Sequence, residues 1–167
     1  KKNLKRTIEK ARAAMLSQIE FWERDRGTVD ASVSTRLGLY SPLFSYGESV
    51  EFWTGCYSMN QYKSSSKYSI DHLNPPETLA EFCFDIPINI YDEDRFKDIC
   101  EYAVRTHRVT SEENIALRLL KFVYPTKEKY KILGIELVYK NGTPANYVHS
   151  TPEGFDEWES EKIRKSD

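Results

Sequence analysis

The residues with the clearest chemical potential are Asp71 and His72, which place an acid beside an imidazole. They lie at the end of an alternating segment, 68–72, shortly before two consecutive prolines. A carboxylate can bind a divalent metal ion, and a neutral imidazole can accept a proton from a water molecule. The pair therefore indicates either a metal-assisted hydrolytic site or a simple strand end, in which Asp71 caps a turn.

The string Ile70-Asp71-His72-Leu73-x-Pro75 resembles the first half of the HNH nuclease motif. The resemblance implies a metal-dependent nuclease in which Asp71 binds the metal and His72 deprotonates the attacking water. It further implies that Asn89 braces the loop and that Asp98, on a following helix, completes the site. The chain departs from the pattern because no second His follows Asn89 and Pro87 interrupts the expected second strand.

Length and composition limit the classes of protein to which the chain can belong. The 167 residues fit one domain, and 40% apolar with 30% charged residues is typical of a soluble globular protein. The net charge of -2 provides no overall basic surface for nucleic acid, and no apolar run approaches the length of a membrane span. Three cysteines without a zinc-binding spacing favour reduced thiols inside the cell. The missing initiator Met favours an excised segment.

An amphipathic helix is predicted for residues 3–25, and Gly27 is expected to end it. Its apolar stripe comprises Leu4, Ile8, Ala11, Met15, Ile19 and Trp22. We therefore expect residues 1–27 to form an N-terminal helix, which is either packed on its own domain or the end of a coiled coil. Residues 28–167 are expected to form a single globular domain. Its first part, 28–47, is predicted to be a connection with at most a short strand at 36–40.

Aromatic and β-branched residues predict strands at 49–59, 67–72, 81–90 and 131–139. The first two are expected to form a hairpin. Asn141-Gly142 predicts a turn, with Tyr147 and Val148 in the returning strand.

Helices are predicted from Asp92, with His107 and Arg108 at the C-terminus, and from a capping box at 110–113, with Ile115, Leu119 and Val123 facing inward. A further charged helix or tail is expected at 153–165. The predicted fold is α+β, with an N-terminal amphipathic helix, a mainly antiparallel sheet and two central helices packed on one face.

The preferred functional hypothesis is a non-enzymatic intracellular protein-interaction domain that binds a protein partner or self-associates. Its expected binding residues are Ile8 and Met15 on the helix and Trp53, Tyr57 and Tyr62 from the aromatic-rich segment. This hypothesis requires no cofactor, no metal and no membrane. Two alternatives stay open: the HNH-like nuclease, and a non-catalytic nucleic-acid-binding module in which aromatic side chains beside lysines stack on bases.

Overall fold

The computed structural model describes residues 3–26, 28, 36–44, 46, 49–146 and 150–166. The chain divides into two compact units, one from residues 1–47 and 74–104 and the other from residues 48–73 and 105–167. The domain boundary predicted after residue 27 stays a prediction, because Gly27 lies outside the described residues. Tyr147 and Val148, predicted as a returning strand, also lie outside them.

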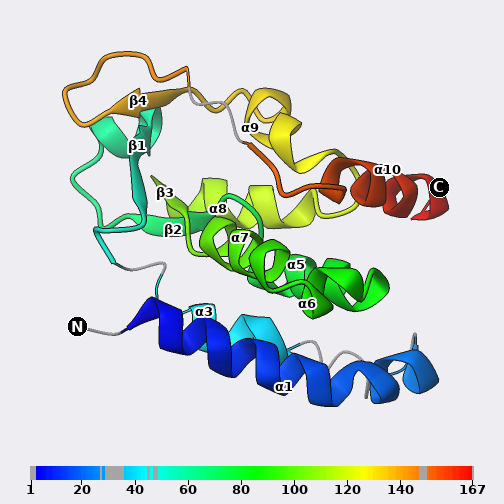
Figure 1. The fold of residues 1–167 in the computed structure, drawn as a ribbon. Helices are drawn as coiled ribbons and strands as arrows, with labels where there is room; N and C mark the ends of the chain where they lie inside the picture. Colours follow the sequence, from blue (N-terminus) through cyan, green and yellow to red (C-terminus); the bar gives the residue numbers. More distant parts are fainter. Residues whose placement is uncertain are drawn as a thin grey trace. The chain divides into compact units, whose positions relative to one another are not determined.

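The first unit is helical in its described residues (Figure 1). Its elements are α1 (Leu4–Asp25), the π-helical turn η1 (Arg36–Tyr40), α3 (Ser41–Phe44), α5 (Pro76–Asp85), α6 (Ile88–Tyr91) and α7 (Glu93–Ala103). The short strand expected at 36–40 is therefore wrong, since that segment is π-helical.

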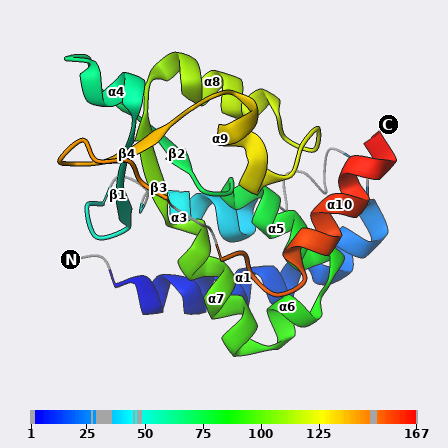
Figure 2. The same ribbon diagram turned by 90° about the horizontal axis from the view of Figure 1, so that it is seen from above.

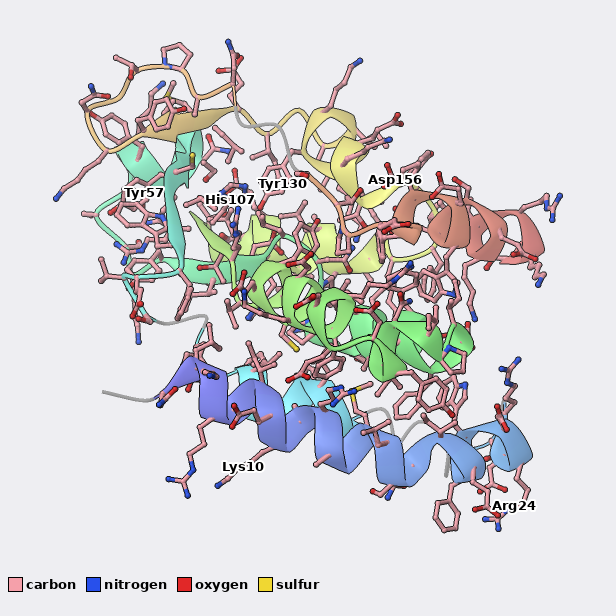
Figure 3. The ribbon with its side chains drawn as sticks, in the orientation of Figure 1. Lys10, Arg24, Tyr57, His107, Tyr130 and Asp156 are labelled. Carbon is pink, nitrogen blue, oxygen red and sulfur yellow. The ribbon has the colours of Figure 1, made fainter. Side chains whose placement is uncertain are left out.

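Helix α1 begins at the N-cap Asn3, whose side chain accepts a hydrogen bond from the Arg6 backbone N–H. The buried residues of α1 are Ile8, Ala11, Met15, Ile19 and Trp22, which confirms the predicted stripe apart from Leu4. Trp22 stacks on Phe84 of α5, with ring centroids 5.2 Å apart. Charged side chains such as Lys10 and Arg24 lie on the side of α1 away from α5 (Figure 3). The stripe therefore forms part of the core of its own unit.

The strand predicted at 81–90 is wrong, because this segment belongs to α5 and α6. Phe82, Cys83 and Phe84 are all fully buried, so α5 is apolar around most of its circumference. A short apolar run of this kind shows neither the helical nor the strand period. Pro76 is tolerated because the first turn of a helix needs no backbone N–H donor at that position.

The second unit contains the sheet (Figures 1 and 2). Its elements are β1 (Trp53–Ser58), α4 (Met59–Lys63), β2 (Ser69–His72), β3 (Thr106–Val109), α8 (Ser111–Leu119), the 3-10 turn η2 (Thr126–Glu128), α9 (Lys129–Ile132), β4 (Leu137–Tyr139) and α10 (Phe155–Ser166). Strand β4 covers only the end of the strand predicted at 131–139, because the earlier residues form α9 and a turn.

The strand order within the described residues is β2-β3-β1-β4. Strand β3 pairs antiparallel with β2 and parallel with β1, and β4 pairs antiparallel with β1. The hairpin predicted between the first two strands is wrong, because β3 lies between them. His107 and Arg108, predicted to end a helix, instead lie in β3, one of the two inner strands. The structure nevertheless confirms the α+β class, the N-terminal helix and a sheet with mostly antiparallel pairing.

Helix α8 has its inner face opposite to the one predicted. Ile115, Leu119 and Val123 are 61%, 75% and 53% exposed, whereas Glu113 and Leu117 are buried. Both sets recur every four residues, so helical spacing by itself selects neither. Burial of the Glu113 carboxylate is compensated by hydrogen bonds, and this allows the polar side of the first turn to face inward.

The Glu113 carboxylate joins the capping box to β1 and α4. It accepts hydrogen bonds from Ser58 Oγ at 2.5 Å, Asn60 Nδ2 at 2.9 Å and the Thr110 backbone N–H at 2.9 Å. The Thr110 hydroxyl in turn accepts from the Glu113 backbone N–H at 3.2 Å. The capping box predicted from sequence is therefore confirmed, and its glutamate makes two further contacts that no local pattern indicates.

Replacing Glu113 by alanine is expected to lower the free energy of unfolding by about 2 kcal/mol, because buried donors lose their shared acceptor. Chemical denaturation of the whole chain measures the change. Glu112→Ala is the matched control, since Glu112 is an exposed acid in the same first turn and its loss should cost less than about 0.5 kcal/mol. Equal losses in the two variants would contradict the bridging role of Glu113.

Candidate functional site

Four side chains of the second unit form what we call the Arg108 cluster: Trp53, Tyr57, Tyr68 and Arg108. The strand register explains why they meet. Arg108 of β3 pairs with Tyr57 of β1 and with Ile70 of β2. The register of β1 shifts between Trp53 and Tyr57, but Trp53 pairs with Thr106, two residues before Arg108, and so lies on the face of Arg108. Tyr68 continues the face of Ile70. All four side chains are therefore presented on one face of the sheet.

The Arg108 guanidinium is held by aromatic rings. Its central carbon lies 4.0 Å from the Trp53 ring centroid, 4.3 Å from that of Tyr68 and 5.7 Å from that of Tyr57. Since β3 lies between β2 and β1, Tyr68 approaches from one side and the other two rings from the opposite side. Trp53 and Tyr57 also contact each other edge to face at 5.0 Å. The cation is thus fixed by cation–π contacts, which gain strength where water is partly excluded.

One hydrogen bond completes this arrangement: Arg108 Nη1 donates to the Tyr57 hydroxyl at 3.1 Å. All four residues are half-buried. Within the described part of the chain, Arg108 makes no ion pair with a carboxylate. The cluster therefore presents one preorganised positive charge whose remaining N–H groups are available at the edge of the guanidinium plane.

The opposite face of the sheet carries a polar network of Thr54, Asp71, His107 and Tyr130, which we call the Asp71 network. The Tyr130 hydroxyl donates to the Asp71 carboxylate, and Thr54 Oγ1 and His107 Nδ1 share a hydrogen bond of 2.5 Å. The His107 and Tyr130 rings meet edge to face at 5.4 Å (Figure 3). Asp71 and His107 are register partners, so β2 and β3 place these side chains together.

Burial changes the acidity of groups in and near this network. It raises the pKa of Asp71 to about 6, although the hydrogen bond from Tyr130 and the charge of Lys129 act in the other direction. Burial also raises the pKa of Tyr130 well above its usual value, and the Asp71 charge adds to that effect. His72 has its pKa lowered to about 4 by burial. Burial therefore brings the pKa of the Asp71 carboxyl close to neutral pH.

The structure does not bring Asp71 and His72 together. They are consecutive residues of β2, so their side chains point to opposite faces of the sheet. The Asp71 carboxylate is engaged by Tyr130, while His72 lies on the face of the Arg108 cluster. Among the described residues, no group of three or more His, Cys, Asp or Glu side chains is arranged to hold a metal ion.

The two helper residues of the nuclease hypothesis belong to the first unit. Asn89 lies in α6, where its Oδ1 accepts a hydrogen bond from Arg95 Nε at 3.1 Å. Asp98 is an exposed residue of α7. The strand–loop–strand–helix order that the resemblance requires is broken, because helix α5 replaces the second strand.

The remaining predicted binding residues differ in their accessibility. Ile8 and Met15 are buried in the core of the first unit. Tyr62 of α4 is 43% exposed, and its hydroxyl lies where a β-carbon on Gly142 would be only 2.7 Å away. Tyr62 therefore covers the turn at Gly142, and Trp53 and Tyr57 are the two that join the Arg108 cluster.

Sequence reasoning missed Tyr68, Arg108, His107 and Tyr130. The sequence predicts a strand at Tyr68 and a helix end at His107 and Arg108. Strand β3 has only four residues, and Thr106, His107 and Val109 are all buried, so it has no alternation that would signal a strand. Only the pairing with β1 and β2 reveals that Arg108 stands among aromatic rings.

Comparison of the chain with protein-family models, with curated proteins and with solved structures gave no match. Among the described residues, no helix combines the length and apolar character needed to cross a bilayer.

Proposed function

We propose that the chain is a non-enzymatic intracellular protein-interaction domain and that the Arg108 cluster is its binding surface. The observation that carries this proposal is the convergence of Trp53, Tyr57, Tyr68 and Arg108 on one sheet face. Trp, Tyr and Arg are the residue types that contribute most binding energy at protein interfaces. A rigid aromatic support also reduces the entropy lost when the arginine engages a partner.

Two further observations support the proposal. The cysteines, Cys56, Cys83 and Cys100, are free and buried, as expected for a protein in a reducing compartment. Two apolar residues of α8, Ile115 and Leu119, are exposed in the same unit, and so is Val123 in the turn that follows the helix. Exposed apolar side chains are available for contact with a partner.

The test is a selection of random peptides displayed on phage against the whole chain, followed by affinity measurement on variants. Selected peptides are expected to bind at least about tenfold more weakly to Arg108→Ala and Trp53→Ala, because these changes remove the central anchors. Arg118→Ala is the matched control, since Arg118 is an exposed arginine on α8 and its loss changes the net charge equally. Thermal unfolding verifies that each variant is folded.

Two results would count against this function. Peptides whose affinity is the same for wild type and for both cluster variants would place the binding surface elsewhere. Tighter binding of single-stranded oligonucleotides than of any selected peptide, with a steep dependence on salt, would favour the nucleic-acid-binding alternative. That alternative draws on the same cluster, because aromatic rings beside a cation also stack on bases. Sedimentation of the same variants tests self-association.

A further inference from the structure

The donors of the Arg108 guanidinium are only partly used. Its central carbon lies over the Trp53 and Tyr68 rings, 4.0 Å and 4.3 Å from their centroids, and Nη1 donates to the Tyr57 hydroxyl. Within the described residues, this is the single hydrogen bond that the Arg108 side chain makes. A guanidinium has five N–H groups that all point outward in one plane, and the other side-chain donors of Arg108 have no partner among the described residues. The edge of this plane has the geometry that binds a carboxylate through two parallel hydrogen bonds.

Tyr57 adds a second donor beside this edge. Its oxygen accepts the Nη1 hydrogen bond, which leaves its own O–H proton free to donate. The described residues provide no acceptor for that proton. An oxygen atom placed against the edge of the guanidinium can therefore receive hydrogen bonds from both Arg108 and Tyr57.

Charge identifies the class of ligand. The cluster contains one cation and no acid, so a single negative charge would neutralise it. A carboxylate carries one charge and matches the planar fork of an arginine, whereas phosphate-binding sites on peptides use clusters of arginines. Nucleic acid would require several cations to displace its counterions. The half-buried setting further favours a ligand that neutralises the charge, because a partly desolvated cation gains more from an ion pair than an exposed one.

From these observations we infer that the Arg108 cluster recognises a carboxylate of the bound peptide, held by the edge of Arg108 and the Tyr57 hydroxyl. Trp53 and Tyr68 act as positioning residues that keep the guanidinium in place. The inference rests on the proposed function, since it names the group that the partner presents. The carboxylate comes either from the C-terminus of the partner or from an Asp or Glu side chain.

The experiment follows the Arg108 Nε–H signal in nitrogen-15 NMR spectra of the whole chain, assigned by its loss in Arg108→Lys. The probes are N-acetyl-leucine, which mimics a C-terminus, and the α-amide of N-acetylglutamate, which mimics an acidic side chain. N-acetyl-leucinamide is the uncharged control, and inorganic phosphate is the competing anion. Each carboxylate probe is expected to shift the signal saturably. The probe that binds more tightly indicates whether the carboxylate comes from a C-terminus or from an acidic side chain.

Two variants measure the contribution of each donor, with probe binding followed by the backbone amide signals of β1 and β3. Arg108→Lys should weaken carboxylate binding at least about tenfold, because an ammonium cannot form the paired hydrogen bonds. Tyr57→Phe keeps the ring and removes one donor, so a loss of about threefold to tenfold is expected. Arg118→Lys should bind like the wild type. Equal shifts with N-acetyl-leucinamide, undiminished binding to Arg108→Lys, or tighter binding of phosphate than of both carboxylates would overturn the inference.

The inference and the proposed function fail in different ways. Selected peptides that require Trp53 but keep their affinity after their carboxyl groups are amidated would leave the function standing and refute the carboxylate. If the carboxylate probes bind at Arg108 but no peptide is selected, the carboxylate site stands and the peptide-binding function is refuted.

Discussion

Met15→Asp is expected to lower the free energy of unfolding by at least about 4 kcal/mol, because it places an unpaired carboxylate in a fully buried position. Met15 is 0% exposed and packs against the backbone of η1, where a β-carbon on Gly38 would lie 2.6 Å from Met15 Cγ. So close an approach leaves no room for water to solvate the new charge. Urea denaturation measures the loss, and hydrogen–deuterium exchange in α5 should show faster uptake.

The neighbouring substitution Leu16→Asp provides the matched control. Leu16 lies one residue further along α1 and is 37% exposed, so the same charge is introduced on the solvent side of the helix. Its effect should stay below about 1 kcal/mol, within the range of surface substitutions and helix propensity. A Met15→Asp chain that keeps wild-type stability but loses self-association would contradict the core assignment and restore the helix as an interface.

The pH dependence of stability should change in opposite directions when Asp71 and His72 are replaced. Burial raises the pKa of Asp71 from 3.8 to about 6. Between these values the folded state binds more protons than the unfolded state, so this group's contribution is full below pH 3.8 and is lost as the pH rises through 6. The difference corresponds to about 3 kcal/mol. Asp71→Asn removes this loss, so its stability relative to wild type should rise over the same window.

The contribution of His72 has the reverse sign. Burial lowers its pKa from 6.5 to about 4, so the unfolded state binds more protons between these values. This group's contribution is full above pH 6.5 and is lost as the pH falls through 4, again by about 3 kcal/mol. His72→Gln lacks this dependence, so its stability relative to wild type should fall as the pH rises from 4 to 6.5.

Urea denaturation between pH 3.5 and 7 tests both variants, because the midpoint and slope of each transition give the free energy of unfolding at that pH. In the wild type the two contributions largely offset each other, so each variant is compared with the wild type at every pH. Other titrating groups, such as Glu159, cancel in these differences because all the proteins retain them. Tyr130→Phe provides a third arm: it removes a hydrogen bond that lowers the Asp71 pKa and should therefore extend the loss to higher pH. If stability relative to the wild type changes with pH in the same direction for Asp71→Asn and His72→Gln, the opposite pKa shifts of Asp71 and His72 are refuted.

Local patterns predicted the elements whose signals are self-contained. The stripe of α1 keeps the helical period from Ile8 to Trp22, and the capping box of Thr110 and Glu113 marks the start of α8 wherever the helix packs. Strands β1 and β2 were also found from their aromatic and alternating residues. In each case a single short segment contains the whole pattern, and no distant residue needs to be known.

The segments that were predicted incorrectly depend on neighbours distant in the chain. Helix α5 is buried on most sides, so its apolar residues carry no period that separates helix from strand. Strand β3 is four residues long and is stabilised by ladders to both β1 and β2. For α8, two faces had the required spacing, and the hydrogen bonds that Ser58 and Asn60 donate to Glu113 favour burial of its polar face.

The candidate site divides in the same way. The sequence by itself determined that segment 49–59 contains an aromatic-rich strand with Trp53 and Tyr57. It also singled out Asp71 and His72, but it could not show that they point to opposite sides of a sheet. Strand order and register decided that Arg108 meets Trp53, Tyr57 and Tyr68, and that Asp71 meets Tyr130. Such meetings depend on which strands pair, and pairing follows from the burial and hydrogen bonding of the whole unit rather than from any local pattern.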